Sequence, residues 1–410
     1  MSSLSKAVEC EFPSTAGPLQ PACLCTGPKN GARDLNGFRV CHVSPVPRRD
    51  ERAFSRESIP VTDYGVIPSI VGPHGENGYS HSVKFVPVRK AGNRAYRVLL
   101  ASRLVIQALR QRADLYHVHS PEHIPAGLIL KCLFRKRVVY DTREDFPAMM
   151  LTKTYLPVRW RELAKKLTFR AEQLAARCFD GFITADAGTL RQYAKSGKSK
   201  KLVFYNLPNL QFYPEPPTQE KEFDLVYRGG LSERAGTFIL LEALKMLSEQ
   251  GVAAKLLMFG YTDDERTQVM IKDHIQKLQL GAQVTLNGII PQVEMAATLR
   301  RARISVCPLQ RIPKFLNNIP VKVFESWACG LPVVASDLPP IRPFFRKSQH
   351  ALLFKSDDPR QLAGVIRQLL SDPGRIARLG QEVRSDVVER YNNRVEARKL
   401  LSFYQKIAAD

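Results

Sequence analysis

The stretch that decides the fold runs from residue 304 to residue 337, ISVCPLQRIPKFLNNIPVKVFESWACGLPVVASD. Its apolar start predicts a strand that ends at Pro308, and a helix carrying Lys322 follows and ends at Gly330. The run PVVAS at 332–336 predicts a second strand directly after that helix. A strand, a helix and a strand in close succession are typical of a parallel βαβ unit.

The same alternation occurs on both sides of a proline-rich segment, NLPNLQFYPEPPTQEK. Strand patterns such as DLYHVHS, KRVVYDT and DGFITA precede this segment, and FDLVYRGG, AAKLLMFG and VTLNGII follow it. We therefore predict an α/β protein with two doubly wound domains, at 37–207 and 223–387, joined by a linker at 208–222. Residues 1–36 are rich in Pro, Gly, Ser and Thr, so we expect a disordered extension there.

One segment, WRELAKKLTFRAEQLAARCF, gives the clearest amphipathic helix pattern. One face is apolar at three- and four-residue spacing and is made of Trp160, Leu163, Ala164, Leu167, Ala171, Leu174, Ala175 and Cys178. The other face carries the basic residues Arg161, Lys165, Lys166, Arg170 and Arg177.

Composition bounds the function. The 410 residues include 61 Lys and Arg against 39 Asp and Glu, a net charge of +22, which favours anionic partners: nucleic acid, acidic lipid or phosphorylated small molecules. No apolar run is long enough to cross a membrane, the first residues lack a secretory-signal pattern, and the eight cysteines form no CxxC pair. We expect reduced thiols and a cytoplasmic location.

A first candidate phosphate site is YRGGLSERAG at 227–236. Gly229 and Gly230 follow a strand and precede a helix, where backbone amides suit a pyrophosphate. Arg228 and Arg234 can add charged contacts to phosphate oxygens. A plain strand-to-helix turn is the alternative explanation.

A second candidate lies at the helix that carries Lys322 and Glu325. Ligands of doubly wound sheets bind beyond the carboxyl ends of the strands, where this helix begins. Glu325 can bond sugar or ribose hydroxyls, and Lys322 can offset diphosphate charge. The alternative is that Glu325 only benefits from the helix dipole.

Polar residues also follow two strands of the first half. His117, His119 and His123 lie in YHVHSPEH, and Arg143 begins the RED triplet of YDTRED. Pro121 argues against a helix that would align His119 with His123 for a metal, so we expect no metal and a polar cluster facing the cleft. No motif for covalent catalysis is present in the sequence.

Together these motifs resemble the retaining family 4 glycosyltransferases of GT-B fold. The similarity is strongest in YRGGLSERAG, LLMFG, VTLNGII, ISVCPL and IPVKVFESWACGLPVVASD, and it continues more weakly through DLYHVHSPEHIPAGL, VVYDTREDFP and YNLPNL. The resemblance implies two Rossmann-like domains facing a cleft, with a final helix at 388–410 that packs back on the first domain.

The resemblance also implies an activity: metal-independent transfer from a UDP- or GDP-sugar to a saccharide or lipid-linked acceptor, with no cofactor. The glutamate at 325 then contacts the donor ribose, and the glycine pair at 229 and 230 holds the diphosphate. Gly260, Gly288 and Ile289 are expected beside the donor, with Gly288 and Ile289 next to the base. His119, Arg143 and Glu325 are the expected catalytic residues.

Three departures from the family pattern favour, as an alternative, a catalytically silent relative that binds a nucleotide sugar or scaffolds polysaccharide assembly. Asn317 stands eight residues before Glu325, where the family has a second glutamate, and we expect it to bond a donor hydroxyl. Ala235 replaces a basic residue, with Arg234 one place earlier. Arg143 stands where relatives often carry histidine, and an arginine cannot act as a base at neutral pH.

Basic residues crowd the first half, from Arg89, Lys90 and Arg94 to Lys136 and Arg137. We expect this domain to make peripheral contact with an anionic membrane, on the inner face of the cell membrane, with a solvated basic surface as the alternative. No aromatic and basic residues interleave on a sheet, so nucleic acid is not an expected partner.

Overall fold

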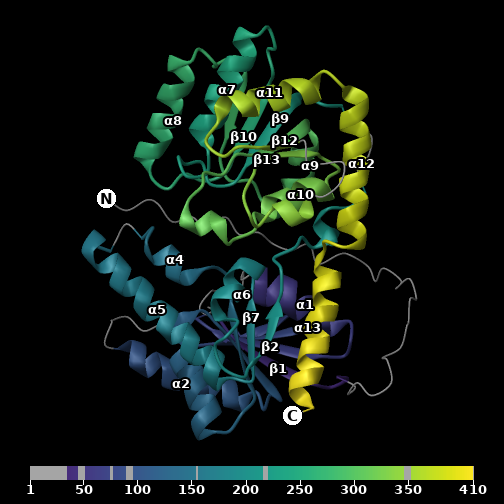
Figure 1. Cartoon of the computed structure of the whole chain (residues 1–410). Coiled ribbons are helices and arrows are strands. Elements are labelled where there is room, and N and C mark those ends of the chain that lie inside the picture. Colours follow the sequence, from purple (N-terminus) through teal and green to yellow (C-terminus); the bar gives the residue numbers. More distant parts are fainter. Residues whose placement is uncertain are drawn as a thin grey trace.

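The computed structural model describes residues 35–44, 51–73, 77–88, 96–153, 156–215, 220–345 and 352–409. Two α/β domains lie one above the other (Figure 1). Residues 1–34 of the predicted extension lie outside the described residues, whereas Leu35 is buried in the core of the first domain. Cys10, Cys23 and Cys25 also lie outside them, and the five cysteines described are free thiols.

The first domain is built on a sheet with the order β3-β4-β2-β1-β5-β6-β7-β8, and β3 is its antiparallel strand. Its strands are β1 (Arg39–Val43), β2 (Ile67–Gly72), β3 (Gly78–Ser80), β4 (Val83–Pro87), β5 (Leu115–His119), β6 (Val138–Thr142), β7 (Gly181–Thr184) and β8 (Lys200–Val203). Parallel strands covered on both faces are apolar throughout, which explains the runs VVY and FIT.

Helices and short helical turns connect these strands. They are the turn Glu51–Ser58, α1 (Ile59–Thr62), α2 (Tyr96–Arg110), the turn Pro121–His123, α3 (Ile124–Leu128) with its wider continuation Ile129–Leu133, α4 (Phe146–Met150), α5 (Val158–Cys178), α6 (Ala187–Tyr193) and the turn Leu210–Phe212.

The second domain has a fully parallel sheet of order β11-β10-β9-β12-β13-β14, the doubly wound arrangement that the sequence predicts. Its elements are β9 (Phe223–Arg228), α7 (Thr237–Glu249), β10 (Leu256–Phe259), α8 (Glu265–Lys277), β11 (Val284–Asn287), the turn Gln292–Glu294, α9 (Met295–Arg300), β12 (Ala302–Cys307), the turn Pro313–Leu316, α10 (Val321–Ala328), β13 (Val333–Ser336), the turn Arg342–Phe344, β14 (Leu353–Phe354), α11 (Pro359–Leu370) and α12 (Pro373–Glu389).

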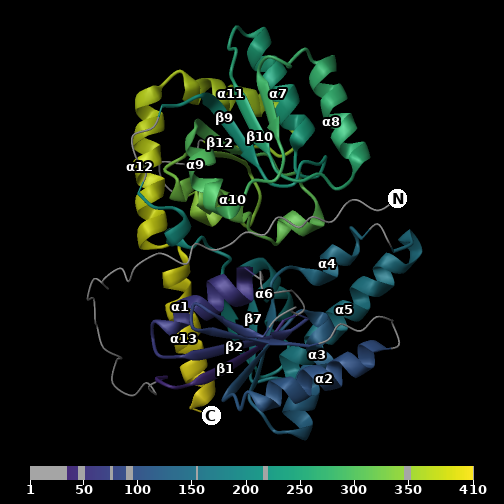
Figure 2. The ribbon, with the colours of Figure 1, turned by 180° about the vertical axis from the view of Figure 1, so that it is seen from behind.

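The chain then returns to the first domain. Helix α12 runs down one side of the molecule and α13 (Asn393–Ala408) continues beside the lower sheet (Figures 1 and 2). Leu400, Tyr404 and Ile407 of α13 share a buried cluster with Val40 of β1 and Leu115 of β5. The last helix therefore completes the core of the first domain.

Helix α5 departs from the usual arrangement of an amphipathic helix. Ala175, Ala176 and Glu172 are buried against the domain, and Glu172 accepts hydrogen bonds from Tyr140 and Tyr193. Of the predicted apolar face, Ala171, Ala175 and Cys178 pack against the core, whereas the large residues Trp160, Leu163, Leu167 and Leu174 are exposed. Apolar spacing thus predicts the helix correctly but identifies only part of the face that packs.

Candidate active site in the interdomain cleft

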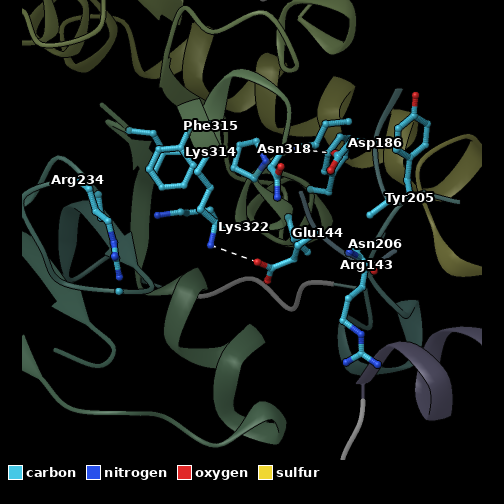
Figure 3. A pocket seen from close by; sticks show the side chains of 18 of the residues that line it. Arg143, Glu144, Asp186, Tyr205, Asn206, Arg234, Lys314, Phe315, Asn318 and Lys322 are labelled. Atoms are coloured by element: carbon cyan, nitrogen blue, oxygen red, sulfur yellow. Dashed lines mark hydrogen bonds and ion pairs between the residues drawn. The ribbon is translucent and has the colours of Figure 1, made fainter. Parts of the chain in front are cut away.

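A cavity of about 260 Å³ opens between the two domains (Figure 3). Both domains contribute to its walls at the carboxyl ends of their strands, as doubly wound sheets commonly do. The first domain supplies Arg143, Glu144, Ala185, Asp186, Tyr205, Asn206 and Leu207, and the second supplies Gly230, Ser232, Arg234, Ala235, Tyr261, Leu309, Lys314, Phe315, Asn318, Ile319, Pro320, Val321, Lys322 and Phe324.

Lys322 is a cation placed for an anionic ligand. Its Nζ lies 4.5 Å from the centre of the Tyr227 ring and 3.4 Å from the Tyr227 hydroxyl. Among the described residues, no carboxylate is within ion-pair distance of Lys322, whereas Lys314 pairs with Glu144 at 3.3 Å and Arg234 with Asp263 at 2.9 Å. The lysine charge is therefore available to offset phosphate charge.

The loop that contains Gly229, the glycine loop, lies close to the ammonium group of Lys322. Gly260 has φ +147°, and a Cβ atom there would lie 1.8 Å from the carbonyl oxygen of Gly229, so only glycine fits. A Cβ atom on Gly229 would itself lie 3.4 Å from Lys322 Nζ. The structure thus brings Gly229 and Lys322 together, and Gly260 permits the close approach of the two strand ends.

Arg228 and Glu325 form an ion pair beside the cavity, between the end of β9 and helix α10. Glu325 is buried and Arg228 is mostly buried, and neither side chain lines the cavity itself. The sequence assigned Arg228 to phosphate and Glu325 to a hydroxyl. In the structure the two side chains form an ion pair with each other. A donor that reached Glu325 would therefore meet a carboxylate that Arg228 already orients.

The Gly288–Ile289 loop sits next to the glycine loop. Gly288 accepts a hydrogen bond from the amide of Gly260 at 3.1 Å, and Ile289 is exposed. Neither Gly288 nor Ile289 is part of the cavity wall in this structure.

Asn317 contacts the opposite domain, which corrects its expected place at the donor. Its Nδ2 donates to Asp145 Oδ2 at 2.9 Å, and the amide of Ile319 donates to Asp186 Oδ1 at 2.7 Å. Asn318, rather than Asn317, lines the cavity. The 317–319 segment is thus a clasp between the domains, because its polar groups are satisfied by carboxylates of the first domain.

Asp186 is a titratable group within this clasp. Burial raises the pKa of Asp186 to about 7, even though the Ile319 amide and the Arg52 charge both favour the carboxylate. Its ionisation therefore changes near neutral pH.

His119 does not reach the cavity, contrary to its expected catalytic contact. Its side chain is fully buried, its Nδ1 donates to Asp141 Oδ2 at 3.0 Å, and its Nε2 lies 2.9 Å from His42 Nδ1. Arg52 donates twice to Asp141, at 2.6 Å each, and also to Asn206, which lines the cavity, at 2.7 Å. His119 is therefore connected to the cavity only indirectly, through Asp141, Arg52 and Asn206.

Electrostatic interactions stabilise this buried network of His119, Asp141 and Arg52. Burial alone would raise the pKa of Asp141, but the Arg52 charge and hydrogen bonds from His119 and Arg52 hold it well below its usual value. His117 shares a hydrogen bond of 2.8 Å with the Tyr404 hydroxyl of α13, so the network also links the last helix to β5.

Part of the network has the composition of a metal site. One atom each of His42, Glu57, His117 and His119 lies within 4.8 Å of the others, and all four residues are buried. The sequence argued against a metal held by His119 and His123, and in the structure His123 is hydrogen-bonded to the backbone carbonyl of His119 at 2.9 Å. His117 is a close neighbour of His119 on β5, but His42 of β1 and Glu57 of the following turn are distant in sequence, so local spacing does not reveal them.

The sequence missed several cavity residues. Tyr205 and Asn206 follow β8, Tyr261 follows β10, and Lys314 and Phe315 lie in the turn after β12. The strand-end rule applied to every strand would have found the first three. Arg143, by contrast, lies in the cavity wall as expected.

Comparison with known proteins agrees with this geometry. Residues 211–386 match the model of the family described as "Glycosyl transferases group 1". The amylovoran biosynthesis glycosyltransferase AmsK of Erwinia amylovora is 27% identical over 179 residues, and the putative colanic acid biosynthesis glycosyltransferase WcaL of Escherichia coli is 29% identical over 204 residues. These matches span 43% and 48% of this chain, and the same shares of AmsK and WcaL, which is about half the length of each relative.

The solved structure of HepE from Anabaena in complex with UDP-glucose shares the fold, with a TM-score of 0.69 at 15% identity. The alignment covers 91% of this chain and all of HepE. The protein therefore has the GT-B fold, with two Rossmann-like domains around a cleft. The similarity to the glycosyl transferases group 1 covers residues 211–386 of the second half.

Proposed function

We propose that the protein is a glycosyltransferase that moves a sugar, with retention of anomeric configuration, from a UDP- or GDP-sugar to a saccharide or lipid-linked acceptor. Cell-surface or exopolysaccharide synthesis is the proposed setting, which the names of AmsK and WcaL support. The observation that carries the proposal is the position of Lys322 over the Gly229 loop. A metal-independent reaction belongs to the same proposal.

Each cleft residue has a proposed role in the donor complex. The ammonium of Lys322 offsets diphosphate charge, and the backbone of Gly229 and Gly230 lets the phosphates approach closely. Glu325, oriented by Arg228, accepts hydrogen bonds from sugar or ribose hydroxyls. The UDP-glucose complex of HepE, which shares the fold, supports a nucleotide sugar as the ligand.

The proposed reaction takes place on one face of the donor sugar. The bond from the anomeric carbon to the diphosphate breaks as the acceptor oxygen approaches, and a diphosphate oxygen takes the acceptor proton. Lys322 stabilises the charge that develops on the diphosphate. Arg143, from the first domain, faces the cavity as a cation that can orient an anionic acceptor.

The test is titration calorimetry with a panel of UDP- and GDP-sugars. For the best donor we expect Lys322→Ala and Glu325→Ala each to weaken binding by at least tenfold. Glu222→Ala is the matched control, because Glu222 also pairs with an arginine of the second domain, Arg301, but is exposed and outside the cavity. Unchanged affinity in Glu325→Ala would refute the assignment of Glu325.

A relative that binds the donor without transfer is the second candidate. It is favoured by the clasp, because Asn317 replaces the family glutamate and its amide is engaged by Asp145. Donor hydrolysis and transfer assays at saturating nucleotide sugar distinguish the two: binding with no turnover supports the silent relative.

A further inference from the structure

The outer face of helix α5 carries an apolar stripe that nothing in the transfer reaction explains. Trp160, Leu163, Leu167 and Leu174 are each between 43% and 55% exposed. Single exposed apolar residues are common, but a row of large ones along one helix marks an interaction surface. We name these four residues the α5 stripe.

The orientation of the stripe is fixed by the packing of the opposite face. Ala175 and Ala176 allow the helix to approach the sheet closely, and the Glu172 carboxylate is held by the Tyr140 and Tyr193 hydroxyls. Rotating α5 to bury its leucines would break both hydrogen bonds to Glu172 and leave the buried Tyr140 and Tyr193 hydroxyls without this partner. The stripe therefore faces outward in the folded protein.

A basic ridge runs beside the stripe. At about 100° per residue, Arg159, Lys166, Arg170 and Arg177 lie next to the leucines on the exposed side, and all four are exposed. Along the whole helix six basic residues stand against two acidic ones, Glu162 and the buried Glu172. A helix with an apolar strip, a neighbouring basic strip and a tryptophan is typical of segments that lie in a membrane interface.

The surface continues beyond α5. Helix α3 lies between α2 and α5, and its continuation ends at Leu133 and Phe134, which are exposed and followed by Arg135 and Lys136. Arg89, Lys90 and Arg94, which the sequence also assigns to a membrane-facing surface, lie outside the described residues.

We propose that the α5 stripe inserts into the interfacial layer of an anionic lipid bilayer while its basic ridge binds the lipid headgroups. Charge selects this occupant: a second copy of the chain, with its own net charge of +22, would repel the ridge, whereas acidic lipids neutralise it. The α5 surface specifies where the first domain contacts the membrane, and this proposal rests on the proposed function. In the described residues no helix is long and apolar enough to cross a bilayer.

The first experiment measures binding of the full chain to vesicles, by flotation, with phosphatidylcholine alone and with phosphatidylglycerol added. We expect binding that needs the anionic lipid and decreases at least tenfold in the double variant Trp160→Ser/Leu167→Ser. Val269→Ser/Met270→Ser is the matched control, because both residues are exposed on α8 of the other domain. Equal binding by the stripe variant and the control would overturn the proposal.

A second double variant tests the ridge. Lys166→Glu/Arg170→Glu should lose binding to anionic vesicles at least tenfold, and Lys272→Glu/Lys277→Glu on α8 should not. Light scattering without vesicles tests a second copy as the occupant: a dimer that the stripe variant abolishes would overturn the bilayer proposal.

Nucleotide-sugar titration separates this inference from the proposed function. The stripe residues lie outside the cavity, so Trp160→Ser/Leu167→Ser should bind the donor as the parent does. Donor binding without any vesicle binding refutes the α5 surface alone, and vesicle binding without donor binding refutes the donor site alone.

Discussion

Replacing Asp186 by Asn should make the stability of the protein less dependent on pH. The Asp186 carboxylate sits in the clasp, where it accepts from the Ile319 amide at 2.7 Å, and burial raises its pKa from 3.8 to about 7. A raised pKa means that the folded state binds the proton more tightly than the unfolded chain. Its stabilising contribution is therefore complete below about pH 3.8 and is lost as the pH rises through about 7.

The size of the effect follows from the shift. A rise of about three pKa units corresponds to about 4 kcal/mol at pH values above 8. Asparagine keeps an oxygen to accept from Ile319 but carries no charge. We expect Asp186→Asn to be more stable than the parent by about 4 kcal/mol at pH 8.5, and by only about 1 kcal/mol at pH 4.5.

Thermal unfolding followed by circular dichroism, between pH 4.5 and 8.5, measures this difference. For a domain of this size about 4 kcal/mol corresponds to a Tm difference of about 10 °C. Asp263→Asn is the control, since Asp263 is exposed and pairs with Arg234 at the surface. Parent and Asp186→Asn curves that stay parallel across the pH range would refute the reasoning about burial.

Three further perturbations test the rest of the architecture. Gly260→Ala should destabilise the second domain by on the order of 3 kcal/mol and abolish donor binding, because its Cβ atom would meet a backbone carbonyl; calorimetric melting and donor titration check it. Tyr404→Phe should cost about 1 to 2 kcal/mol in urea unfolding, because it removes the hydroxyl bonded to buried His117 and loosens α13; an unchanged midpoint would contradict this link. Asn317→Ala should cost about 1 kcal/mol and widen the cleft, since the bond to Asp145 joins the two domains; a larger radius of gyration in X-ray scattering is the expected result.

The fold could be predicted from the sequence because its cause is local. Strands buried on both faces are apolar and commonly end at glycine or proline. Runs such as VVY and PVVAS can therefore be recognised as strands from the sequence alone. The position of α13 has a different origin. The leucines and Tyr404 of α13 indicate only that the helix packs against some apolar surface. That surface is the sheet of the first domain, where His117, the hydrogen-bond partner of Tyr404, lies 287 residues earlier in the chain.

The part of the cavity wall that the second domain supplies could also be predicted in part. Gly229, Gly230 and Lys322 follow strands of one sheet, and carboxyl ends of parallel strands meet at one edge. Asn317 and His119 could not be placed this way, because their partners belong to another domain or to another strand. Asp145 is 172 residues from Asn317, and His42 is 77 residues from His119.

Helix α5 connects the cleft with the outer surface of the first domain. Arg143 and Glu144 line the cavity, α4 follows at once, and α5 begins at Val158. Helix α4 lies on the side of the first domain that is turned toward the second (Figure 1). A bilayer bound along the α5 stripe would therefore lie a short stretch of chain away from the two acceptor-side residues of the cavity. Under these two proposals the net positive charge would have two separate uses: Lys322 for a diphosphate, and the α5 ridge for the surface from which a lipid-linked acceptor would arrive. A water-soluble saccharide acceptor would need only the first of these, so the exposed leucines favour the lipid-linked one.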